Sequence, residues 1–425
     1  MKAVILAAGE GVRMRPLTLT RSKHMIPVAG KPILGHILDA LRQLGIRDIL
    51  LVVGYKRELV TSHFGDGSDF GLNLQYAVQK KISGTADAVG YAEDFVGSED
   101  FLMLYGDLLM TGGAISSVLE GYRRAGAPLM AVVPADEPER YGVVKVKDGM
   151  VKALVEKPPK GEAPTELINA GIYVFDSKIF RLIGRTSPSL RKEFELTDSI
   201  RLLLENRERI SAQPINPENW QDIGRPWDLL EANERVLRGA KLEVRGTVED
   251  GAQLRGAVGL AEGARIRSGA YVEGPVLIDS GSDIGPNCYI RPFTSIGKGV
   301  RVGNACEIKN SIIMNETNIA HLSYVGDSII GEDCNFGAGT ITANLRLDEK
   351  TIKVLVKDDL VDSGRTKLGV IMGDRVKTAI NVNFMPGVKV GPDSWIGPNI
   401  TVIRDVPSGS FILERREVES RRVPP

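Results

Sequence analysis

The sequence of 425 residues predicts a Rossmann-like α/β domain followed by a left-handed parallel β-helix of hexapeptide repeats. Two observations support this fold class. Short apolar runs alternate with segments of helical periodicity over residues 1–237, whereas from about residue 244 an aliphatic side chain recurs every six residues. We therefore expect an α/β domain over 1–237, a β-helix over 244–406 and a C-terminal tail over 407–425.

In the α/β part, four apolar runs have the length and composition of buried strands. The apolar residues at 33, 37, 41 and 44 share helical spacing, and the helix that they predict ends at Gly45, a common cap residue. Short buried strands separated by amphipathic helices are typical of a mainly parallel sheet that is covered on both faces. Such sheets bind ligands at the carboxyl ends of their strands. The four runs are Lys2–Ala8, Ile49–Val53, Phe101–Tyr105 and Leu129–Val133.

In the second part, the six-residue period is unbroken from Val248 to Ile308. Neither a helix nor ordinary strand alternation produces this spacing, which is typical of a parallel β-helix. Three hexads make one coil of about 18 residues, so we expect about nine stacked coils. The spacing slips after Ile308 and returns at Phe384. The cysteines share one hexad position, which predicts small core residues rather than metal ligands: they are Cys288, Cys306 and Cys334.

Composition excludes several classes of protein. Lys plus Arg and Asp plus Glu each number 54, and the resulting net charge of zero argues against a nucleic-acid partner. No apolar run reaches the ~18 residues of a membrane span, and the first run is too short for a signal peptide. Three cysteines exclude a disulfide scaffold and fit a reducing compartment. We therefore expect a cytoplasmic protein with no membrane partner.

A glycine-rich turn follows the first strand. Gly9 and Gly11 form a Gly-x-Gly motif, whose backbone N–H groups are suited to bind phosphate. The motif is neither a dinucleotide fingerprint, because Met14 stands at the third glycine, nor a Walker loop, because no Gly-Lys-Ser/Thr follows. Between residues 13 and 31 there are five basic residues and no acidic one, which favours a triphosphate ligand over a solvated basic face. The five are Arg13, Arg15, Arg21, Lys23 and Lys31.

Two aspartates are candidate metal ligands. Asp107 follows the strand Phe101–Tyr105, and next to a triphosphate it becomes a candidate for Mg²⁺. Asp222, in the string Trp-Gln-Asp-Ile-Gly, is a second candidate from far along the chain. Each has a structural alternative: Asp107 as a turn residue, and Asp222 as a cap before Pro226, which is expected to open the last helix of this part.

Residues 1–237 contain a series of motifs, which in chain order are LAAGEGVRM, PLTLTRSKHMIP, Gln79, Gly84-Thr85, YGD, EKP, NAG and WQDIG. Together these motifs resemble the sugar-1-phosphate nucleotidylyltransferases over the whole of this part. The resemblance implies that a sugar phosphate oxygen attacks the nucleotide α-phosphorus and displaces pyrophosphate. Arg13 and Lys23 would neutralise the developing charge, as would Mg²⁺ on Asp107 and Asp222.

The same resemblance implies the substrate contacts of this part. Gln79 would pair with a uracil or thymine edge, because its amide offers a donor and an acceptor, and the nucleotide would be UTP or dTTP. The sugar would be a hexosamine-1-phosphate. The implied nucleotide contacts are Ala8, Gly9, Gly11, Gln79, Gly84 and Thr85. The implied sugar-phosphate contacts are Gly142, Glu156, Lys157 and Asn169.

The β-helix part contains one histidine, His321. A lone histidine on a repeat scaffold is more often a structural hydrogen-bonding residue than a catalyst. Here it lies where the hexad spacing slips, Tyr324 follows three residues later, and Arg291 and Lys309 lie one to two coils upstream. This arrangement suits a neutral general base beside a bound phosphate.

The strings EIK, AHLSYVGD and NFGAGT resemble the acetyltransferase half of the bifunctional glucosamine-1-phosphate acetyltransferase and N-acetylglucosamine-1-phosphate uridylyltransferase family. The resemblance implies that His321 takes a proton from the sugar 2-amine as the amine attacks acetyl-CoA. Arg291 and Lys309 would bind the sugar phosphate, while Tyr324 and Asn344 orient the amine and ring. It also implies a homotrimer with sites between neighbouring β-helices.

One segment departs from the bacterial members of this family. Leu345 follows Asn344 where they have tyrosine, and the charged stretch 346–367 breaks the hexads. This stretch resembles archaeal members, in which Lys350 and Lys353 would assist the acetyltransferase site.

Two alternatives to the bifunctional enzyme remain. The front part equally resembles the glucose-1-phosphate thymidylyltransferases, so a single-activity thymidylyl- or guanylyltransferase with an oligomerising β-helix is one. A non-catalytic regulatory subunit is the other. The presence of the charged candidates argues against the second and partly against the first; they are Arg13, Lys23, Asp107, Asp222 and His321.

Overall fold

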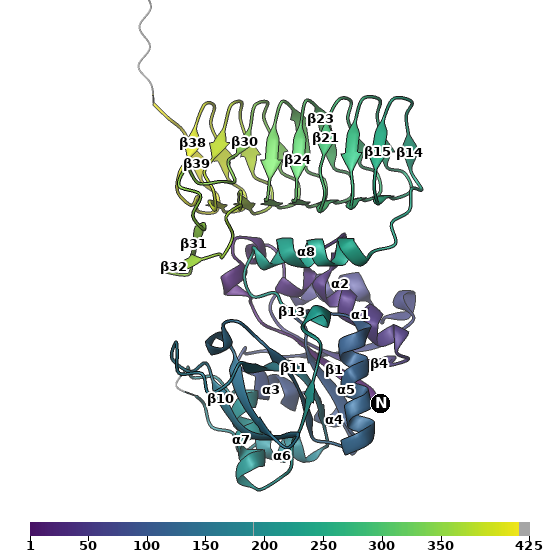
Figure 1. The fold of residues 1–425 in the computed structure, drawn as a ribbon, viewed down its shortest axis with the longest axis vertical. Coiled ribbons are helices and arrows are strands. Elements are labelled where there is room, and N and C mark those ends of the chain that lie inside the picture. Colours follow the sequence, from purple (N-terminus) through teal and green to yellow (C-terminus); the bar gives the residue numbers. More distant parts are fainter. Residues whose placement is uncertain (190, 416–425) are drawn as a thin grey trace, which may run out of the picture. The chain divides into compact units, whose positions relative to one another are not determined.

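The computed structural model describes residues 1–189 and 191–415 (Figure 1). The chain packs into two compact units. Unit 1 comprises residues 1–11, 21–26 and 31–224, and unit 2 comprises 12–20, 27–30 and the chain from 225 onward. Packing units and sequence domains are different properties, and the predicted boundaries at 237 and 244 stay predictions.

Unit 1 contains a nine-stranded sheet with the order β5-β4-β1-β6-β11-β8-β12-β10-β9. The strands β5, β4, β1 and β6 run parallel, and β11 pairs antiparallel with both β6 and β8. The sheet is therefore mixed rather than mainly parallel, because β11 and β10 each run antiparallel to both of their neighbours. The bounds are β1 Lys2–Ala7, β4 Asp48–Val53, β5 Asn73–Val78, β6 Phe101–Tyr105, β8 Leu129–Pro134, β9 Gly142–Lys147, β10 Met150–Glu156, β11 Leu167–Phe175 and β12 Ser211–Pro214.

Helices cover both faces of this sheet, as predicted. Successive residues of a strand point to opposite faces, and in β1 Ile5 packs with Ile37 of α1, whereas Val4 packs in a second cluster with Val89 of α3 and Ile200 of α7. The bounds of these helices are α1 Ile33–Gln43, α2 Arg57–Phe64, α3 Thr85–Gly90, α4 Glu93–Val96, α5 Gly112–Ala125, α6 Lys178–Ile183 and α7 Leu196–Glu205.

The smaller elements complete unit 1. The predicted first helix ends as expected, because Gly45, with φ of 77°, donates its N–H to the Arg42 carbonyl at 3.1 Å. A separate two-stranded sheet joins β7 and β13. These strands are β7 Leu108–Met110 and β13 Trp220–Asp222, and the 3₁₀ helices are η3 Lys23–Met25, η4 Ser68–Phe70, η5 Pro138–Arg140 and η6 Pro217–Asn219.

Unit 2 contains the predicted β-helix, built from three parallel sheets (Figure 1). Successive coils pair inward residue on inward residue, as in Ile266 with Ile284 and Ile284 with Val302. The first sheet has β14 Thr247–Val248, β17 Arg265–Ile266, β20 Asp283–Ile284, β23 Arg301–Asn304, β26 Asn318–His321, β29 Asn335–Phe336, β34 Lys377–Thr378, β37 Trp395–Ile396 and β39 Phe411–Ile412. The second has β15 Gln253–Arg255, β18 Tyr271–Glu273, β21 Tyr289–Ile290, β24 Glu307–Lys309, β27 Tyr324–Gly326, β30 Ile341–Thr342, β35 Asn383–Phe384 and β38 Thr401–Val402. The third has β16 Val258–Leu260, β19 Val276–Ile278, β22 Thr294–Ile296, β25 Ile312–Ile313, β28 Ile329–Ile330, β33 Ile371–Met372 and β36 Lys389–Val390.

The slips in the hexad spacing have a structural cause. Ile319 pairs with Val302, and Phe336 pairs with Ile319, so each of these coils has an offset of 17 residues instead of 18. After Asn344 an insertion leaves the coil as a hairpin of β31 Lys353–Val356 and β32 Asp359–Asp362. The predicted tail lies outside the described residues from 416 onward.

The cysteines confirm the expected core positions. Cys288, Cys306 and Cys334 are buried in the β-helix core. Burial raises the pKa of Cys288 and Cys334 to about 12. Thiolates are the reactive and metal-binding form, so these side chains act as core residues.

Unit 2 also contains one long helix and two short N-terminal segments. In α8 (Asp228–Gly239), fully buried Asn233 accepts the Ala29 N–H at 2.8 Å and the Ser295 hydroxyl at 2.5 Å, and donates to the Phe293 carbonyl at 2.8 Å. Gly30 has φ of 75°, and a Cβ there would lie 2.8 Å from a methyl group of Leu277. The two segments carry η1 Val12–Met14, η2 Leu17–Leu19 and β2 Pro27–Val28, and β3 Lys31–Pro32 follows.

Candidate active sites

The ends of β1 and β6 bring the first candidate residues together. The strands are parallel neighbours, and the Gly106 N–H donates to the Leu6 carbonyl at 2.9 Å. The chain segments that leave them, with Ala8 and Gly9 on one side and Asp107 on the other, therefore start side by side. A Cβ at Gly106 would lie 2.7 Å from that carbonyl oxygen, so this position requires glycine.

A lysine and an aspartate form the charged centre of this site. Lys23 Nζ lies 2.6 Å from Asp107 Oδ2, and the lysine side chain is 6% exposed against 32% for the aspartate. The cation is thus held in the interior, while the carboxylate reaches the surface. Such a pair offers one positive and one negative group to a bound nucleotide phosphate and its metal ion.

Asp222 lies on the strand beside Asp107. Strand β13 pairs antiparallel with β7, which places Asp222 opposite Leu108, and the Ile223 N–H donates to the Asp107 carbonyl at 3.4 Å. Residues 115 positions apart thus become neighbours, and Asp222 ends a strand instead of capping a helix. The described residues contain no cluster of three or more His, Cys, Asp or Glu side chains that could hold a metal alone. Two carboxylates fit Mg²⁺, which commonly combines one or two of them with substrate phosphates and water.

Sequence reasoning missed His24, which is buried beside this pair. Its Nδ1 lies 2.8 Å from the Ser22 hydroxyl. Burial lowers the pKa of His24 to about 4, so the imidazole is neutral near pH 7 and adds no charge to the centre. No motif marks this residue, because its environment exists only in the fold.

The Gln79 amide is held by two acceptors. Nε2 donates to the Gly84 carbonyl at 3.1 Å and to Asp87 Oδ2 at 2.8 Å, and the side chain is buried. Ser83 also donates to Asp87, at 2.9 Å. Both amide protons are therefore used within the protein, and Oε1 is the atom left for a base. Thr85 Oγ1 accepts the Leu196 N–H at 2.9 Å, which ties this segment to α7.

The predicted sugar contacts lie on β9, β10 and β11. Gly142 is opposite Glu156, and a Cβ at Gly142 would lie 3.0 Å from Glu156 Oε2. Asn169 accepts the Gly171 N–H at 3.0 Å and donates to the Tyr173 hydroxyl. Lys157 lies 3.6 Å from Glu156. A cavity of about 580 Å³ borders Glu156 and Lys157, so these two residues face open space.

Arg13 belongs to the other unit. It lies in η1 and its side chain is exposed. The two units are described separately, so the predicted partnership of Arg13 with Lys23 stays a prediction.

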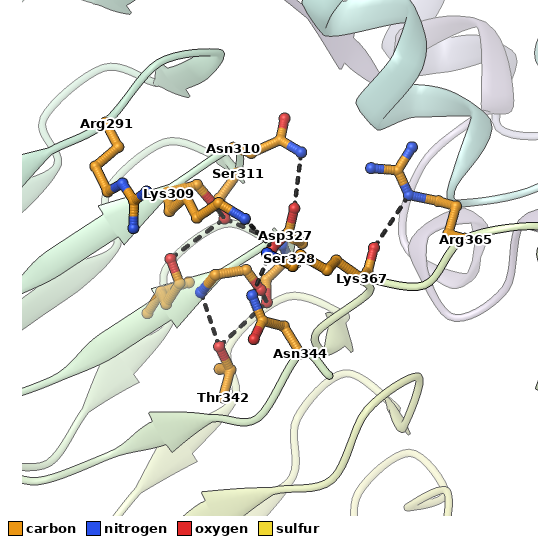
Figure 2. Close-up of polar contacts among 12 residues, drawn as sticks. Arg291, Lys309, Asn310, Ser311, Asp327, Ser328, Thr342, Asn344, Arg365 and Lys367 are labelled. Atoms are coloured by element: carbon orange, nitrogen blue, oxygen red, sulfur yellow. Dashed lines mark hydrogen bonds and ion pairs between the residues drawn. The ribbon is translucent and has the colours of Figure 1, made fainter. Parts of the chain in front are cut away.

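The second candidate site is a polar cluster on the β-helix, centred on Asp327 (Figure 2). The Asp327 side chain is 2% exposed and accepts hydrogen bonds from Lys309 Nζ at 2.9 Å, Asn310 Nδ2 at 2.8 Å and Asn344 Nδ2 at 2.5 Å. Asn344 Nδ2 also lies 3.1 Å from the Tyr324 hydroxyl. The structure thus joins Lys309, Tyr324 and Asn344 through Asp327, which sequence reasoning did not select.

Arg291 forms a second ion pair on the same sheet. Its guanidinium donates to Glu307 Oε1 at 2.8 Å, and each of the two side chains is 36% exposed. Glu307 is the strand neighbour of Tyr324, so this pair lies one strand from the Asp327 cluster. Burial raises the pKa of Tyr324, and its hydroxyl stays protonated near pH 7.

The structure places His321 at the end of β26, opposite Asn304, with an exposed side chain. Lys350 and Lys353 lie in the insertion, also exposed. None of the hydrogen bonds and ion pairs described for the chain up to residue 415 links these three side chains to the Asp327 cluster. Their predicted part in acetyl transfer therefore stays a prediction.

The fold and the first site define a nucleotidyltransferase joined to a hexapeptide-repeat β-helix. The Nucleotidyl transferase family model matches residues 2–239, and the model of the GMPPB C-terminal domain matches residues 272–382. The chain is 45% identical to the bifunctional protein GlmU of Methanocaldococcus jannaschii over 100% of both chains. It is 40% identical to the bifunctional sugar-1-phosphate nucleotidylyltransferase/acetyltransferase of Sulfurisphaera tokodaii, over 97% of this chain and 99% of the relative.

A solved structure agrees for the first part of the chain. A putative glucose-1-phosphate thymidylyltransferase from Bacillus anthracis is 33% identical, with a TM-score of 0.50, and the match covers 55% of this chain and 94% of that one. The chain belongs to the family of bifunctional sugar-1-phosphate nucleotidylyltransferases and acetyltransferases of the GlmU type. Among the described residues, no helix combines the length and the apolar character that a membrane crossing requires.

Proposed function

We propose that the protein acetylates glucosamine-1-phosphate with acetyl-CoA and then transfers UMP from UTP to N-acetylglucosamine-1-phosphate, releasing pyrophosphate. The observation that carries the first site is the placement of Asp222 on the strand beside the Lys23–Asp107 pair. These groups are 84 and 115 residues apart in sequence, yet they gather at the carboxyl end of a parallel strand, where such sheets bind ligands.

In nucleotidyl transfer, a phosphate oxygen of the sugar phosphate forms a bond to the α-phosphorus of the nucleotide. The bond from the α-phosphorus to the bridging oxygen breaks, and pyrophosphate leaves. Lys23 and Arg13 offset the negative charge that develops on the phosphates. Asp107 and Asp222 would hold Mg²⁺, which supplies further charge neutralisation when bound. Ala8, Gly9 and Gly11 offer backbone groups to the phosphates.

The base and the sugar occupy opposite ends of this site in the proposal. Gln79 Oε1 accepts the imide N–H of uracil or thymine, with Gly84 and Thr85 alongside, so UTP and dTTP both fit. The sugar and its phosphate meet Gly142, Glu156, Lys157 and Asn169. The cavity beside Glu156 and Lys157 supports these two contacts, whereas Gly142 and Asn169 are not among the residues that line it.

In acetyl transfer, the sugar amine attacks the thioester carbonyl carbon, the carbon–sulfur bond breaks, and CoA leaves as the thiol. His321 takes the proton of the amine and returns it to the sulfur. Arg291 and Lys309 bind the sugar phosphate, and Tyr324 and Asn344 orient the amine. Lys350 and Lys353 assist from the insertion. The Asp327 cluster supports this assignment because it gathers Lys309, Tyr324 and Asn344.

One assay tests both halves of the proposal. Full-length protein is incubated with glucosamine-1-phosphate, acetyl-CoA, UTP and Mg²⁺, omitting one component at a time, and the products are identified by mass spectrometry. Omission of acetyl-CoA should prevent formation of UDP-N-acetylglucosamine, and omission of UTP should leave N-acetylglucosamine-1-phosphate. A protein that transfers nucleotides but never acetylates would instead be the single-activity alternative. We further propose a cytoplasmic homotrimer.

A further inference from the structure

The polar cluster on the β-helix is centred on Asp327, which we call the hub. The carboxylate of the hub only accepts hydrogen bonds and donates none. Each atom that reaches the Asp327 carboxylate is an N–H group: the ammonium of Lys309 and the amides of Asn310 and Asn344 (Figure 2). An ionised carboxylate is the one side chain of this size that accepts at both oxygens and donates at neither. An asparagine in its place would turn an NH₂ group toward at least one of these donors.

The main chain fixes the hub itself. Asp327 has φ of 49°, its N–H donates to the Lys309 carbonyl at 2.8 Å, and its own carbonyl accepts the Gly369 N–H at 2.8 Å. Three stretches of chain, around residues 309, 327 and 369, therefore hold the carboxylate in one place. A buried charge in such a setting is stable only while its partners remain.

The hub determines which atoms of its partners remain free for a ligand. Asn344 uses Nδ2 on Asp327 and on the Tyr324 hydroxyl, which leaves Oδ1 free to accept a hydrogen bond from an amine. Lys309 has three N–H donors, and the bond to Asp327 leaves two of them. The free acceptor suits the amine of an amino-sugar phosphate, and the free donors suit its phosphate, which is on the neighbouring carbon.

We propose that Asp327 is a positioning residue for acetyl transfer, which orients Asn344 Oδ1 toward the sugar amine and the remaining Lys309 donors toward the phosphate. This inference rests on the proposed acetyltransferase function. Asp327 touches no substrate in this scheme and acts through Asn344 and Lys309.

The test compares Asp327→Asn with wild type in both assays on the full-length protein. Misorientation of a reacting group commonly costs ~10²-fold in rate, so acetyl transfer should fall by about 10- to 100-fold. Uridylyl transfer, whose candidate residues lie elsewhere, should be unchanged. Asp393→Asn is the matched control: Asp393 pairs with Arg375 at 2.6 and 2.8 Å but its side chain is 54% exposed. The control should leave both activities at the wild-type level.

A double-mutant cycle separates positioning from a general structural effect. Because Asp327 acts through both Asn344 and Lys309, Asp327→Asn should cost clearly less in a protein that already carries Asn344→Ala than it costs in wild type. Additive losses, or wild-type acetyl transfer in Asp327→Asn, would overturn the proposal. If Asp327→Asn does not fold, Asn310→Ala decides, because it removes one donor from the hub and should lower acetyl transfer in the same direction; an unchanged rate would count against the proposal. Absence of acetyl transfer in the wild-type protein would refute the proposed function instead.

Discussion

At the scale of single residues, the first site depends on a contrast between a buried cation and a more exposed carboxylate. Lys23 is enclosed, and its ammonium is directed by the 2.6 Å contact to Asp107. Asp107 is exposed enough to meet a ligand and lies beside Asp222. Removing either carboxylate changes the charge of the centre.

We predict that Asp107→Ala reduces nucleotidyl transfer by at least ~10³-fold, because removing a group that stabilises transition-state charge commonly costs ~10²–10³ and here Lys23 also loses its partner. Acetyl transfer should stay near wild type. Separate assays of the two reactions on one preparation give the measurement. Loss of both activities in a protein that remains folded would contradict the assignment of two sites.

Gln79 gives a prediction about the nucleotide. Its amide protons are used on Gly84 and Asp87, so only an acceptor faces the base. UTP and dTTP should both be substrates, because the imide N–H of uracil and thymine suits this acceptor. We expect GTP and ATP to be poor substrates, as the resemblance to uridylyl- and thymidylyltransferases implies. Competition assays with the four nucleotides measure the order. A preference for a purine nucleotide would refute the role given to Gln79.

The third prediction at this scale concerns the role of His321 in acetyl transfer. If it is the general base, His321→Ala should lower acetyl transfer by ~10²–10⁴-fold, the usual share of general acid–base catalysis, and leave nucleotidyl transfer intact. If it only braces the turn before Leu322, which has φ of 49°, the alanine variant should melt earlier yet remain active. His321→Asn should then keep much of the rate. Both activities and the melting temperature of the two variants distinguish these outcomes.

At the scale of elements, the β-helix core gives a prediction through its thiols. The three cysteines are buried, and burial raises the pKa of Cys288 and Cys334 to about 12. At pH 8 the thiolate fraction is therefore negligible, and iodoacetamide should not label the native protein within the time that alkylates a free thiol. Denatured protein should take up three labels, counted by intact mass. Rapid labelling of the native protein would show that the coils open.

The elements differ in how far the sequence could predict them. The hexad period predicted the coils because the inward positions carry apolar residues, which are visible in the sequence. The mixed character of the first sheet was missed for two reasons. β9 and β10 are not continuous apolar runs, and the apolar residues of β11 do not reveal that it runs antiparallel to its neighbours. In the sequence, the hairpin of β31 and β32 could be seen only as an interruption of the hexad spacing. His24, Asp87 and Asp327 were missed because each acquires its role from neighbours distant in sequence.

At the scale of the whole molecule, we predict that three chains associate. Light scattering on the purified protein should give three times the mass of one chain. A mixture of two inactive variants, Arg291→Ala and His321→Ala, should regain part of the acetyl transfer if each site uses residues of two chains. A monomer with full acetyl transfer would exclude shared sites.

The contacts of Ala29 and Gly30 limit how this chain can be divided into fragments. A fragment ending at residue 224, where the first packing unit ends, would retain Lys23, Asp107 and Asp222. It would nevertheless lack Asn233 and Leu277, against which Ala29 and Gly30 pack only a few positions after Lys23. Such a fragment would leave Ala29 and Gly30 without these contacts. The same constraint applies to recombination, because a foreign β-helix could replace the native one only if it rebuilt that contact.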